Sequence, residues 1–452
     1  MTPAARIETA IQLLTEIMDT PRPADAIASL FFKNRRYIGA KDRAAVAGQA
    51  YGVLRRWARL SWWIEKVGAP VTPRTLVIAD LMLSQGKTPE SIENNFAGGR
   101  FSPPPMSDAE WKLAKALETR TLAHPKQPDP VKVEVPDWAA EPLQRAFGDR
   151  FLAEMGAMLG EAPLDLRVNP VKGTREEAIA QLAAAGIEAK PTALSPVGLR
   201  LEGRAPIMAL QAYKDGLIEI QDEGSQLVAF LTDAQPGMQV VDFCAGAGGK
   251  TLAIAAMMEN RGRVVAADVL AGRLTRAKER FRRAGLHNIE TRPLANERDP
   301  WVKRHKLRFD RVVVDAPCTG TGTWRRNPDS RWRPLGPGLS ELEGLQASIL
   351  ESAARLVRPG GRLVYATCSL LPEENERQVE GFLARHPDFT LLPVPEAWPA
   401  NWGAPPVKDV MLRLTPLRHD TDGFFAAVMV RKDDGSAPVA EGEGEAEEAG
   451  EA

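Results

Sequence analysis

The sequence predicts an α/β protein whose largest domain is a doubly wound, mostly parallel sheet, preceded by a helical region and a small α+β module. Three observations lead to this prediction. Apolar strand-like runs alternate with amphipathic helical runs from 238 to 432. Apolar residues recur at helical spacing through 4–65, and the stretch 136–225 mixes strand-like runs with a helix. The chain of 452 residues is long enough for two or three domains.

The N-terminal region is expected to be helical. Ile7, Ile11, Leu14 and Met18 recur at helical spacing, and 41–68 is expected to form one long amphipathic segment. Arginines and aromatic residues alternate in this segment, so it could stack on and clamp RNA. The alternative is a helical bundle with a solvated basic face, and both interpretations can hold at once. The residues concerned are Arg43, Arg55, Arg56, Arg59, Tyr51, Trp57 and Trp62.

A proline-rich stretch, 100–135, is expected to link this region to the small module. In the module we expect strands at 164–169 and 198–203, and a helix at 174–186 that ends at a glycine. The main domain should then alternate strands and helices, with a last strand within 422–432 that pairs antiparallel at the far side of the sheet. Its other strands are expected at 238–244, 262–269, 288–294, 309–317, 361–369 and 388–394, and its helices at 251–260, 271–285, 340–357 and 373–386.

Charge and composition favour a cytoplasmic protein with an anionic partner. The net charge of −1 divides into −8 on residues 433–452 and +7 on residues 1–432. A mildly basic body suits RNA, and the acidic tail is expected to be disordered. Three cysteines and five scattered histidines predict neither disulfides nor a metal site. Because no apolar run is long enough to span a bilayer and the N-terminus has no signal core, we expect a cytoplasmic protein. We also expect a monomer.

The stretch VVDFCAGAGGKT, residues 240–251, ends as a phosphate-binding P-loop does. A Walker A loop needs a further glycine five positions before Gly249, where this chain has Cys244. The dinucleotide fingerprint GxGxxG also fails, because its third glycine would fall at Thr251. A glycine turn after the first strand still lets a ligand approach the backbone, and Asp268, ending the next strand, can accept hydrogen bonds from a ribose. These features predict a nucleoside pocket without a phosphate cradle, which fits S-adenosylmethionine.

Two of the cysteines are expected to meet at one edge of the sheet. Asp315 and Cys318 follow the fourth strand and Cys368 follows the fifth, and the carboxyl ends of parallel strands face one crevice. A thiolate that adds to carbon 6 of a cytosine makes carbon 5 nucleophilic toward a sulfonium methyl group, and a thiol is also a good leaving group. Asp315 can hydrogen-bond nitrogen 3 and the amine of the unstacked base. The residues alone leave open which cysteine attacks.

These motifs resemble those of the Sun-type RNA cytosine-C5 methyltransferases, also called the Fmu or RsmB type. The resemblance rests on DFCAGAGGKT, DAPCTGTGTWRRNPD, ATCSLLPEENE and DGFFAA, and more loosely on the N-terminal helices, which resemble a NusB-like RNA-binding domain. It implies a Rossmann-like class I methyltransferase domain, S-adenosylmethionine as cofactor and small-subunit (16S) ribosomal RNA as substrate. We expect a helical domain with its linker at 1–135, the small module at 136–225, the methyltransferase domain at 226–432 and the tail at 433–452.

The resemblance also implies roles for individual residues. Cys368 is the nucleophile, Cys318 assists product release, and Lys250 and Asp315 line the active site. Asn296 stands near the place where the family usually has an acidic residue close to the adenine, and Cys244 is interpreted as a small apolar filler. The expected cofactor-binding residues are Cys244, Ala245, Gly246, Ala247, Gly248, Gly249, Lys250, Asp268, Arg273, Asn296 and Asp315.

The basic segment WRRNPDSRWR, residues 324–333, is expected to contact RNA beside the mouth of the crevice. The residues concerned are Trp324, Arg325, Arg326, Arg331 and Arg333. Three alternatives to methylation of small-subunit rRNA stay open. They are the same chemistry on tRNA or large-subunit rRNA, a catalytically silent RNA-binding assembly factor, and an ATPase built on the GKT ending, which the missing glycine disfavours.

Overall fold

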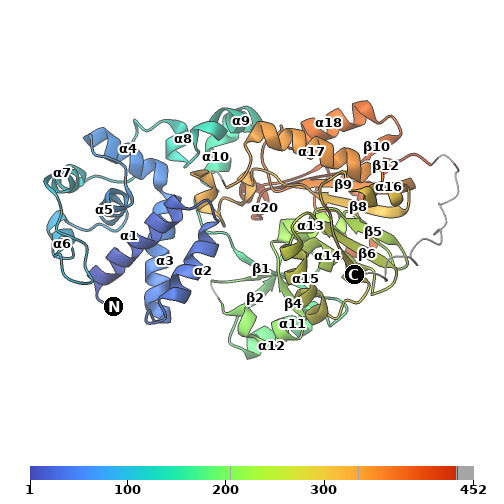
Figure 1. Cartoon of the computed structure of the whole chain (residues 1–452), viewed down its shortest axis with the longest axis horizontal. Helices are drawn as coiled ribbons and strands as arrows, with labels where there is room; N and C mark the ends of the chain where they lie inside the picture. The colour runs from blue at the N-terminus through green and yellow to red at the C-terminus, as the bar shows by residue number, and fades with distance from the viewer. Residues whose placement is uncertain (204, 334, 434, 436–452) are drawn as a thin grey trace, which may run out of the picture. The chain divides into compact units, whose positions relative to one another are not determined.

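The computed structural model describes residues 1–203, 205–333, 335–433 and 435 (Figure 1). The chain forms two compact units. The first, called the helical unit below, contains Met1–Ala162 and Gly320–Gly338. The second, the sheet unit, contains Pro163–Thr319 and Leu339–Ala452. The acidic tail expected at 433–452 lies outside the described residues, apart from Asp433 and Gly435.

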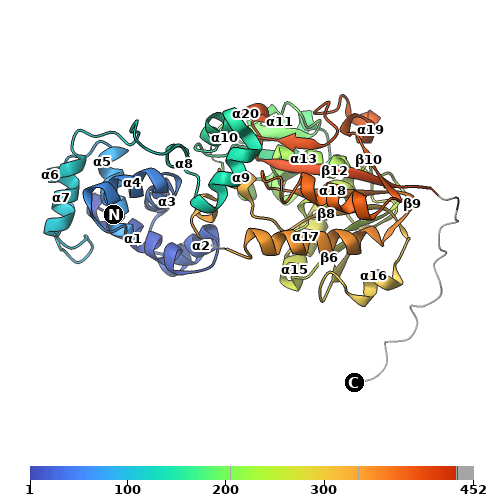
Figure 2. The ribbon, with the colours of Figure 1, turned by 90° about the horizontal axis from the view of Figure 1, so that it is seen from above.

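The helical unit is built around α5 (Pro73–Leu83), in which every residue from 75 to 82 is buried. Thr72 caps this helix in a capping box and Pro73 occupies its first turn, two features that start helices. Helices α1 and α3 lie side by side (Figures 1 and 2) and share the apolar core around α5. The other helices of the unit are α1 (Pro3–Asp19), α2 (Ala24–Asn34), α3 (Ala40–Arg55), α4 (Trp57–Val67), α6 (Pro89–Glu93), α7 (Asp108–Leu117), α8 (Asp129–Lys132), α9 (Asp137–Phe147) and α10 (Phe151–Gly156).

Two stretches of this unit differ from the sequence-based expectation. The presumed linker, 100–135, contains the helices α7 and α8. α7 begins at a capping box formed by Ser107 and Glu110. Residues 136–162 carry α9 and α10 and group with the helical unit, whereas the sequence places them in the small module. The compact units therefore divide after Ala162, and the division of the chain into domains stays a prediction.

The segment 41–68, expected to be a long amphipathic segment, forms two helices. α3 ends at Arg55 and α4 begins at Trp57, with the backbone of Arg56 at φ −122° and ψ 16° between them. The Arg56 guanidinium donates to the fully buried carboxylate of Asp80 at 2.7 Å, which holds the chain at this break. The change of direction lets α4 bury Leu60 and other apolar residues in the core around α5.

Two further arginines of this segment also bond within the helical unit. The Arg59 guanidinium pairs with the buried carboxylate of Glu134 at 2.7 Å, and the Arg43 guanidinium donates to the Ile38 carbonyl oxygen at 2.7 Å. Burial raises the pKa of Glu134, and the charge of Arg59 opposes that rise. These contacts favour the bundle interpretation over an RNA clamp for these two arginines.

The basic segment 324–333 is a buried part of the helical unit. Three of its arginines are at most 8 % exposed, and the Trp324 ring is fully buried: Trp324, Arg325, Arg331 and Arg333. The prediction that these four side chains contact RNA is therefore wrong, whereas for the half-buried Arg326 it stays a prediction. The physical reason for Arg331 and Arg333 is that their guanidinium groups donate to backbone carbonyl oxygens that would otherwise be buried without a donor.

Arg333 and Arg331 show this use of the guanidinium group. Arg333 donates to the carbonyl oxygens of Ile17 and Thr20 at the C-terminal end of α1, where the last helical carbonyls lack donors of their own. Arg331 donates to the carbonyl oxygens of Glu134 at 3.2 Å and Met158 at 2.7 Å. The segment thus fastens separate parts of the helical unit together.

The sheet unit contains an eight-stranded sheet with the order β10-β12-β9-β8-β5-β6-β7, and β11 pairs with β12. Strands β5 to β9 run parallel, and β12 is antiparallel to both β9 and β10. The strands are β5 (Gln239–Asp242), β6 (Arg263–Asp268), β7 (Ile289–Pro293), β8 (Phe309–Asp315), β9 (Val357–Thr367), β10 (Phe389–Leu392), β11 (Leu412–Leu414) and β12 (Phe424–Arg431). The predicted antiparallel last strand is present, but it lies inside the sheet rather than at its far side. Its nearly continuous apolar sequence explains this, since an internal strand is buried on both faces.

Helices cover both faces of this sheet (Figures 1 and 2). One face packs on α13 (Glu223–Phe230), α14 (Gly249–Met257) and α15 (Ala271–Ala284), and the other on α16 (Pro300–Arg304), α17 (Leu339–Ala354) and α18 (Glu376–Arg385). Alternate strand residues serve the two cores: Val240 and Val264 face the first, and Val241 and Val265 the second. This arrangement confirms the predicted doubly wound α/β class. Two short helices, α19 (Val394–Ala397) and α20 (Pro416–His419), complete the unit.

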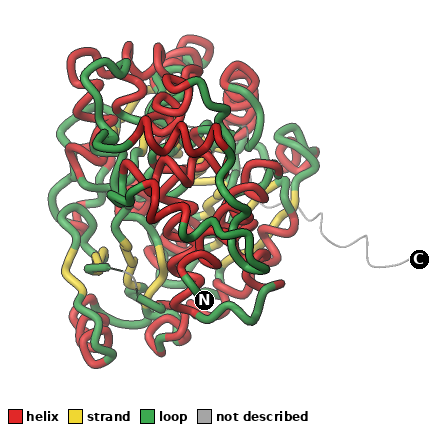
Figure 3. Tube along the Cα trace, turned by 90° about the vertical axis from the view of Figure 1, so that its left-hand side faces the viewer, coloured by secondary structure: helices red, strands yellow, loops and turns green. Residues whose placement is uncertain are grey.

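A second, smaller sheet precedes the large one in the chain. Its order is β2-β3-β1-β4 and all its pairs are antiparallel. Figure 3 draws its strands, like those of the large sheet, in yellow. Leu166 and Leu199 of the sheet pack on Leu182 of its helix. The elements are β1 (Leu164–Val168), α11 (Arg175–Ala184), β2 (Ala189–Pro191), β3 (Gly198–Leu201), α12 (Gln211–Lys214) and β4 (Ile218–Ile220). The small α+β module predicted from the sequence is present.

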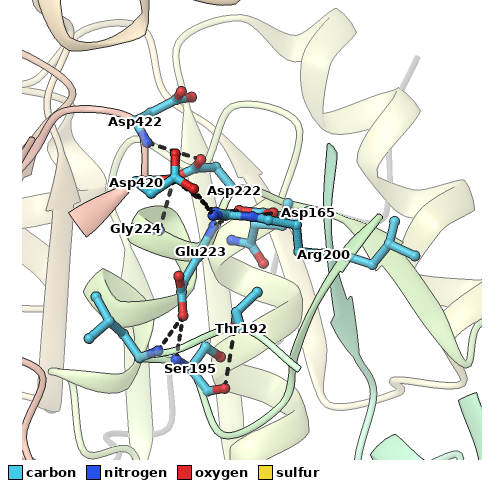
Figure 4. Close-up of polar contacts among 12 residues, drawn as sticks. Asp165, Thr192, Ser195, Arg200, Asp222, Glu223, Gly224, Asp420 and Asp422 are labelled. Atoms are coloured by element: carbon cyan, nitrogen blue, oxygen red, sulfur yellow. Dashed lines mark hydrogen bonds and ion pairs between the residues drawn. The ribbon is translucent and has the colours of Figure 1, made fainter. Parts of the chain in front are cut away.

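A polar network joins this small sheet to the rest of the unit (Figure 4). The Arg200 guanidinium makes two hydrogen bonds to the Asp165 carboxylate, at 2.7 and 2.9 Å, and two to Asp420, at 2.6 Å to its carboxylate and 2.9 Å to its carbonyl oxygen. The Glu223 carboxylate, at the start of α13, accepts hydrogen bonds from the backbone of Leu194 and Ser195 at 2.6 and 2.7 Å. The small sheet, α13 and the entry to β12 are therefore held together.

Candidate active site

The predicted site residues lie at one edge of the large sheet. β5 ends at Asp242, β6 at Asp268, β8 at Asp315 and β9 at Thr367. Because these strands are parallel neighbours, their carboxyl ends open onto the same edge, where ligands bind in sheets of this kind.

The glycine turn after β5 is shaped by two left-handed residues, Gly246 at φ 56° and Gly248 at φ 78°. A Cβ atom on Gly248 would lie 2.5 Å from the Phe281 ring of α15, so only glycine lets the turn pack there. The turn is fixed at its start by the Ala245 amide, which donates to the Ala267 carbonyl oxygen of β6 at 2.9 Å. Gly249 starts α14, whose N-terminus carries the turn.

Asp268 directly contacts this turn. One of its carboxylate oxygens accepts a hydrogen bond from the Gly246 amide at 2.8 Å, and the other accepts one from the Leu270 amide at 2.7 Å. Each oxygen keeps further acceptor capacity, which a ribose hydroxyl can use. Next to it, Val269 and Leu270 are more than half exposed, although both are apolar. The sequence analysis missed these two residues, and their signal was an apolar pair directly after a strand-ending aspartate.

Two further predicted cofactor residues are Arg273, in the first turn of α15, and Asn296, in the loop after β7. Arg273 is exposed, and its guanidinium lies about 4 Å from the position of a Cβ on Gly246, beside the turn. Asn296 is exposed in the loop after β7, where its side-chain oxygen already accepts a hydrogen bond from the Arg298 amide at 2.8 Å. The same loop is joined to β6 through the Leu294 amide, which donates to the Asp268 carbonyl oxygen at 3.0 Å.

A buried carboxyl, Asp242, lies beneath the turn. One oxygen accepts a hydrogen bond from the Thr251 hydroxyl at 2.6 Å, and the other has no partner among the described residues. Burial raises the pKa of Asp242 from 3.8 to about 7. Burial, followed by the charges of Asp242 and two other carboxylates, also raises the pKa of Cys244 well above its usual value. Cys244 packs against the apolar core as a neutral thiol, which supports its interpretation as filler.

Lys250 and Asp315 form the ion pair at the centre of the site. The Lys250 ammonium lies 2.7 Å from the Asp315 carboxylate and 5.3 Å from the centre of the Phe424 ring. Burial alone would lower the pKa of Lys250, but the charge and hydrogen bond of Asp315 outweigh it and raise this pKa. The lysine is therefore kept protonated. In a P-loop the corresponding lysine binds phosphate, whereas here Lys250 is paired with the carboxylate of Asp315.

The two strand-end cysteines lie together, as the sequence predicts. The Sγ atoms of Cys318 and Cys368 are 3.4 Å apart, and both side chains are half-buried. A thiolate at Cys368 would also act on Lys250 and would raise its pKa further. Cys318 and Cys368 thus follow the neighbouring strands β8 and β9, and β8 also ends in Asp315, the partner of Lys250. The hydroxyl groups of Thr319 and Ser369, the residues that follow the two cysteines, are 3.4 Å apart.

Comparison with known proteins identifies the family. A family model described as 16S rRNA methyltransferase RsmB/F matches residues 229–430, and one for the ferredoxin-like domain of RsmF/B-like methyltransferases matches 135–208. The chain is 31% identical over 409 residues to ribosomal RNA small subunit methyltransferase B of Citrobacter koseri, an alignment that covers 87% of this chain and 92% of that protein. This chain belongs to the RsmB/F methyltransferase family.

Two further similarities agree with the family. The chain is 37% identical over 299 residues to a probable ribosomal RNA small subunit methyltransferase B of Synechocystis, which covers 65% of this chain and 66% of that protein. The crystal structure of PH0851 superposes with a TM-score of 0.78 at 28% identity, covering 95% of this chain and 99% of that one. This RsmB/F protein is therefore an S-adenosylmethionine-dependent RNA methyltransferase, which confirms the predicted cofactor and enzyme class and makes the ATPase alternative wrong.

The observed residues fit the cofactor of the RsmB/F family. The glycine turn gives the close backbone approach, Asp268 offers carboxylate oxygens for the ribose, and exposed Val269 and Leu270 offer an apolar surface for the adenine. Lys250, the residue that a P-loop would direct at a phosphate, is paired with Asp315 instead. Among the described residues, no group of three or more His, Cys, Asp or Glu side chains is arranged to hold a metal ion. Nor does any helix in the described part of the chain combine the length and apolarity needed to cross a bilayer.

Proposed function

We propose that this protein methylates carbon 5 of a cytosine in small-subunit ribosomal RNA, with Cys368 as the nucleophile and Cys318 as the residue that assists product release. The observation that carries the proposal is the 3.4 Å contact between two thiols beside the Lys250–Asp315 pair. Methylation without base activation needs no such pair of thiols, whereas carbon 5 of a cytosine must be activated by a nucleophile that later leaves.

The chemistry proceeds in three balanced steps. The Cys368 thiolate adds to carbon 6, forming a carbon–sulfur bond and placing electron density on carbon 5. Carbon 5 would then take the methyl group from the sulfonium of bound S-adenosylmethionine; the carbon–sulfur bond of that methyl group breaks and S-adenosylhomocysteine is the leaving group. The proton on carbon 5 then leaves to a base and the bond between carbon 6 and Cys368 breaks, which restores the ring and frees the thiolate. We assign Cys318 to this last step, because its Sγ lies next to the leaving sulfur.

Lys250 and Asp315 serve the base during these steps. A carboxylate at Asp315 accepts a hydrogen bond from the exocyclic amine of a cytosine, which a uracil cannot donate. The protonated Lys250 holds that carboxylate in place at 2.7 Å and stabilises negative charge that develops on the ring or on Cys368. This pair therefore supports both the choice of cytosine and the addition step.

The cofactor-binding part of the proposal assigns residues of the turn and its neighbours. Asp268 binds the ribose, Val269 and Leu270 pack on the adenine, and the backbone from 244 to 249 lines the pocket, with Arg273 and Asn296 at its rim. The RNA substrate is taken from the relatives, which are named as small-subunit rRNA methyltransferases. The proposal includes a cytoplasmic location and a monomeric state. A mass well above 49.3 kDa in light scattering would contradict the monomer.

The decisive experiment traps the covalent intermediate. Cys318→Ala is expressed in cells, the protein–RNA adduct is isolated under denaturing conditions, and the attached RNA is sequenced. We expect an adduct at one cytosine of small-subunit rRNA, because addition by Cys368 proceeds while release stalls. The double variant Cys318→Ala/Cys368→Ala is the matched control and should give no adduct.

Other outcomes identify the rival functions. An adduct formed only by Cys368→Ala would exchange the roles of the two thiols, and an adduct on tRNA or large-subunit rRNA would correct the substrate. If no variant traps RNA and the wild type transfers no labelled methyl group, the protein is a silent RNA-binding assembly factor and the proposal is wrong.

A further inference from the structure

Two consecutive buried residues, Glu374 and Asn375, lie in the turn between β9 and α18, behind the pair of cysteines. Both are polar, and they are 0 and 4 % exposed. A buried polar side chain is costly unless its hydrogen bonds are satisfied, so the partners of these two residues indicate what they hold.

Glu374 holds the residue after Cys318. Its carboxylate accepts hydrogen bonds from the Thr319 amide at 2.8 Å, from the Thr319 hydroxyl, and from the Gln346 side-chain amide at 3.0 Å. Gln346 in turn donates to the carbonyl oxygen of Pro317 at 2.9 Å. The residues on both sides of Cys318 are therefore held by hydrogen bonds to one linked pair of side chains, Glu374 and Gln346. We call this set of hydrogen bonds the first bracket.

Asn375 does the same for Cys368. Its side-chain oxygen accepts a hydrogen bond from the Thr367 hydroxyl at 2.5 Å, and its side-chain amide donates to the Ser369 carbonyl oxygen at 3.0 Å. The Ser369 amide donates back to the Thr367 hydroxyl oxygen at 3.2 Å. The residues on both sides of Cys368 are thus held by a second set of hydrogen bonds, centred on Asn375. We call this set the second bracket.

The two brackets are rigidly joined. Glu374 and Asn375 are neighbours in the chain, and the Glu374 carbonyl oxygen accepts a hydrogen bond from the fully buried Tyr365 hydroxyl at 2.7 Å. Since one turn carries both brackets, it also sets the spacing of the two Sγ atoms. A displacement of either bracket moves one sulfur relative to the other by a distance that matters for bond making.

We propose that Glu374 and Asn375 are positioning residues with separate duties: Glu374, with Gln346, places Cys318 for product release, and Asn375 places Cys368 for addition to the base. This inference rests on the proposed function and deepens it. It implies that loss of the first bracket slows the last step and leaves RNA attached, whereas loss of the second slows the first step and leaves RNA unattached. A merely structural role predicts no such opposition.

The test compares Glu374→Leu and Asn375→Leu, which keep most of the side-chain volume and remove the hydrogen bonds. With Glu374→Leu we expect the trapped RNA adduct to rise toward the level of Cys318→Ala, and kcat to fall at least tenfold with KM nearly unchanged. With Asn375→Leu the adduct should fall. In the Cys318→Ala background, Asn375→Leu should reduce the adduct at least tenfold, and Glu374→Leu should leave it unchanged.

Two further variants separate positioning from folding. Glu374→Gln keeps one acceptor oxygen for the Thr319 amide and can donate to the Thr319 hydroxyl, so it should restore most of the turnover. Tyr365→Phe is the matched control, because it removes a buried hydrogen bond to the same turn and leaves both brackets complete. Folding of each variant is checked by binding of S-adenosylmethionine in a calorimeter. If a leucine variant fails to bind it, Glu374→Asp and Asn375→Asp replace the pair.

Three results would overturn the proposal. The first is a change of the adduct in the same direction in both leucine variants, or in Tyr365→Phe as strongly as in either. The second is a loss of adduct when Glu374→Leu is added to Cys318→Ala. The third is the absence of any adduct in Cys318→Ala itself, which removes the proposed function and is recognised separately because it needs no variant of the turn.

Discussion

The glycine turn allows a quantitative test, because its three glycines differ in backbone angle and in surrounding space. Gly246 and Gly248 both have positive φ, at 56° and 78°, whereas Gly249 does not. A Cβ on Gly246 has its nearest neighbour at 3.9 Å, but one on Gly248 would lie 2.5 Å from Phe281 and 3.2 Å from Ala277. Gly249 has room, with Gln221 at 3.7 Å.

These differences predict a graded loss of stability on substitution by alanine. A left-handed alanine costs about 1–2 kcal/mol, so Gly246→Ala should lower the free energy of unfolding by about that amount. Gly248→Ala adds the cost of overpacking against a buried ring, about 1–3 kcal/mol, for a total of about 2–5 kcal/mol. Gly249→Ala, in the first turn of α14, should change the free energy of unfolding by less than about 1 kcal/mol.

Urea unfolding followed by circular dichroism measures the three differences, and calorimetry measures binding of S-adenosylmethionine. Gly248→Ala should also weaken cofactor binding most, because relief of the contact with Phe281 shifts the turn or α15 near Asp268. Equal losses of stability for Gly246→Ala and Gly248→Ala would refute the reasoning from crowding. A loss for Gly249→Ala as large as the others would refute the reasoning from φ.

Four other predictions follow from single contacts. Asp242→Asn should remove a pH dependence of the free energy of unfolding. The carboxyl of Asp242 keeps its proton up to about pH 7 in the folded protein but loses it near pH 3.8 in the unfolded chain, so the stability of the wild type relative to the variant falls as pH rises from about 4 to about 7. Urea unfolding at several pH values measures this difference. Arg331→Ala should cost about 2–4 kcal/mol in unfolding, because two buried carbonyl oxygens lose their donor, and should leave the salt dependence of RNA binding unchanged. Asp268→Ala should weaken binding of S-adenosylmethionine by about 10- to 150-fold in calorimetry, the loss of about 1.5–3 kcal/mol of charged hydrogen bonding. Hydrogen peroxide should convert Cys318 and Cys368 to a disulfide with release of water, since their Sγ atoms are 3.4 Å apart, and mass spectrometry should find the loss of two hydrogens reversed by dithiothreitol.

Much of the sheet unit could be predicted from the sequence, because its strands are short apolar runs bounded by glycine or aspartate. The alternation of such runs with helices fixes a parallel sheet, and parallel strands bring Asp268, Asp315 and Cys368 to one edge without knowledge of their distances. The position of β12 inside the sheet could not be predicted, because an apolar strand suits any interior place. Its neighbours are chosen by pairings between residues far apart in the chain.

The basic residues show why charge is a poor guide to location. Arg331 and Arg333 look like RNA ligands in the sequence, and both are buried against backbone carbonyl oxygens. Nothing in the local sequence distinguishes an arginine that caps a distant helix from one that faces solvent, since the helix it caps is some three hundred residues away. For the same reason the duties of Glu374 and Asn375 are visible only in the structure.

The segment from Gly320 to Gly338 has a consequence for how the helical unit of this chain can be exchanged. It leaves the sheet unit directly after Thr319, one residue past Cys318, supplies Trp324, Arg331 and Arg333 to the interior of the helical unit, and returns at Leu339. The helical unit is therefore not an appended module that recombination could attach or remove by a single crossover. A catalytic fragment cut at Ala162 would keep this loop without the partners that bury it, and a working chimera must exchange both stretches together.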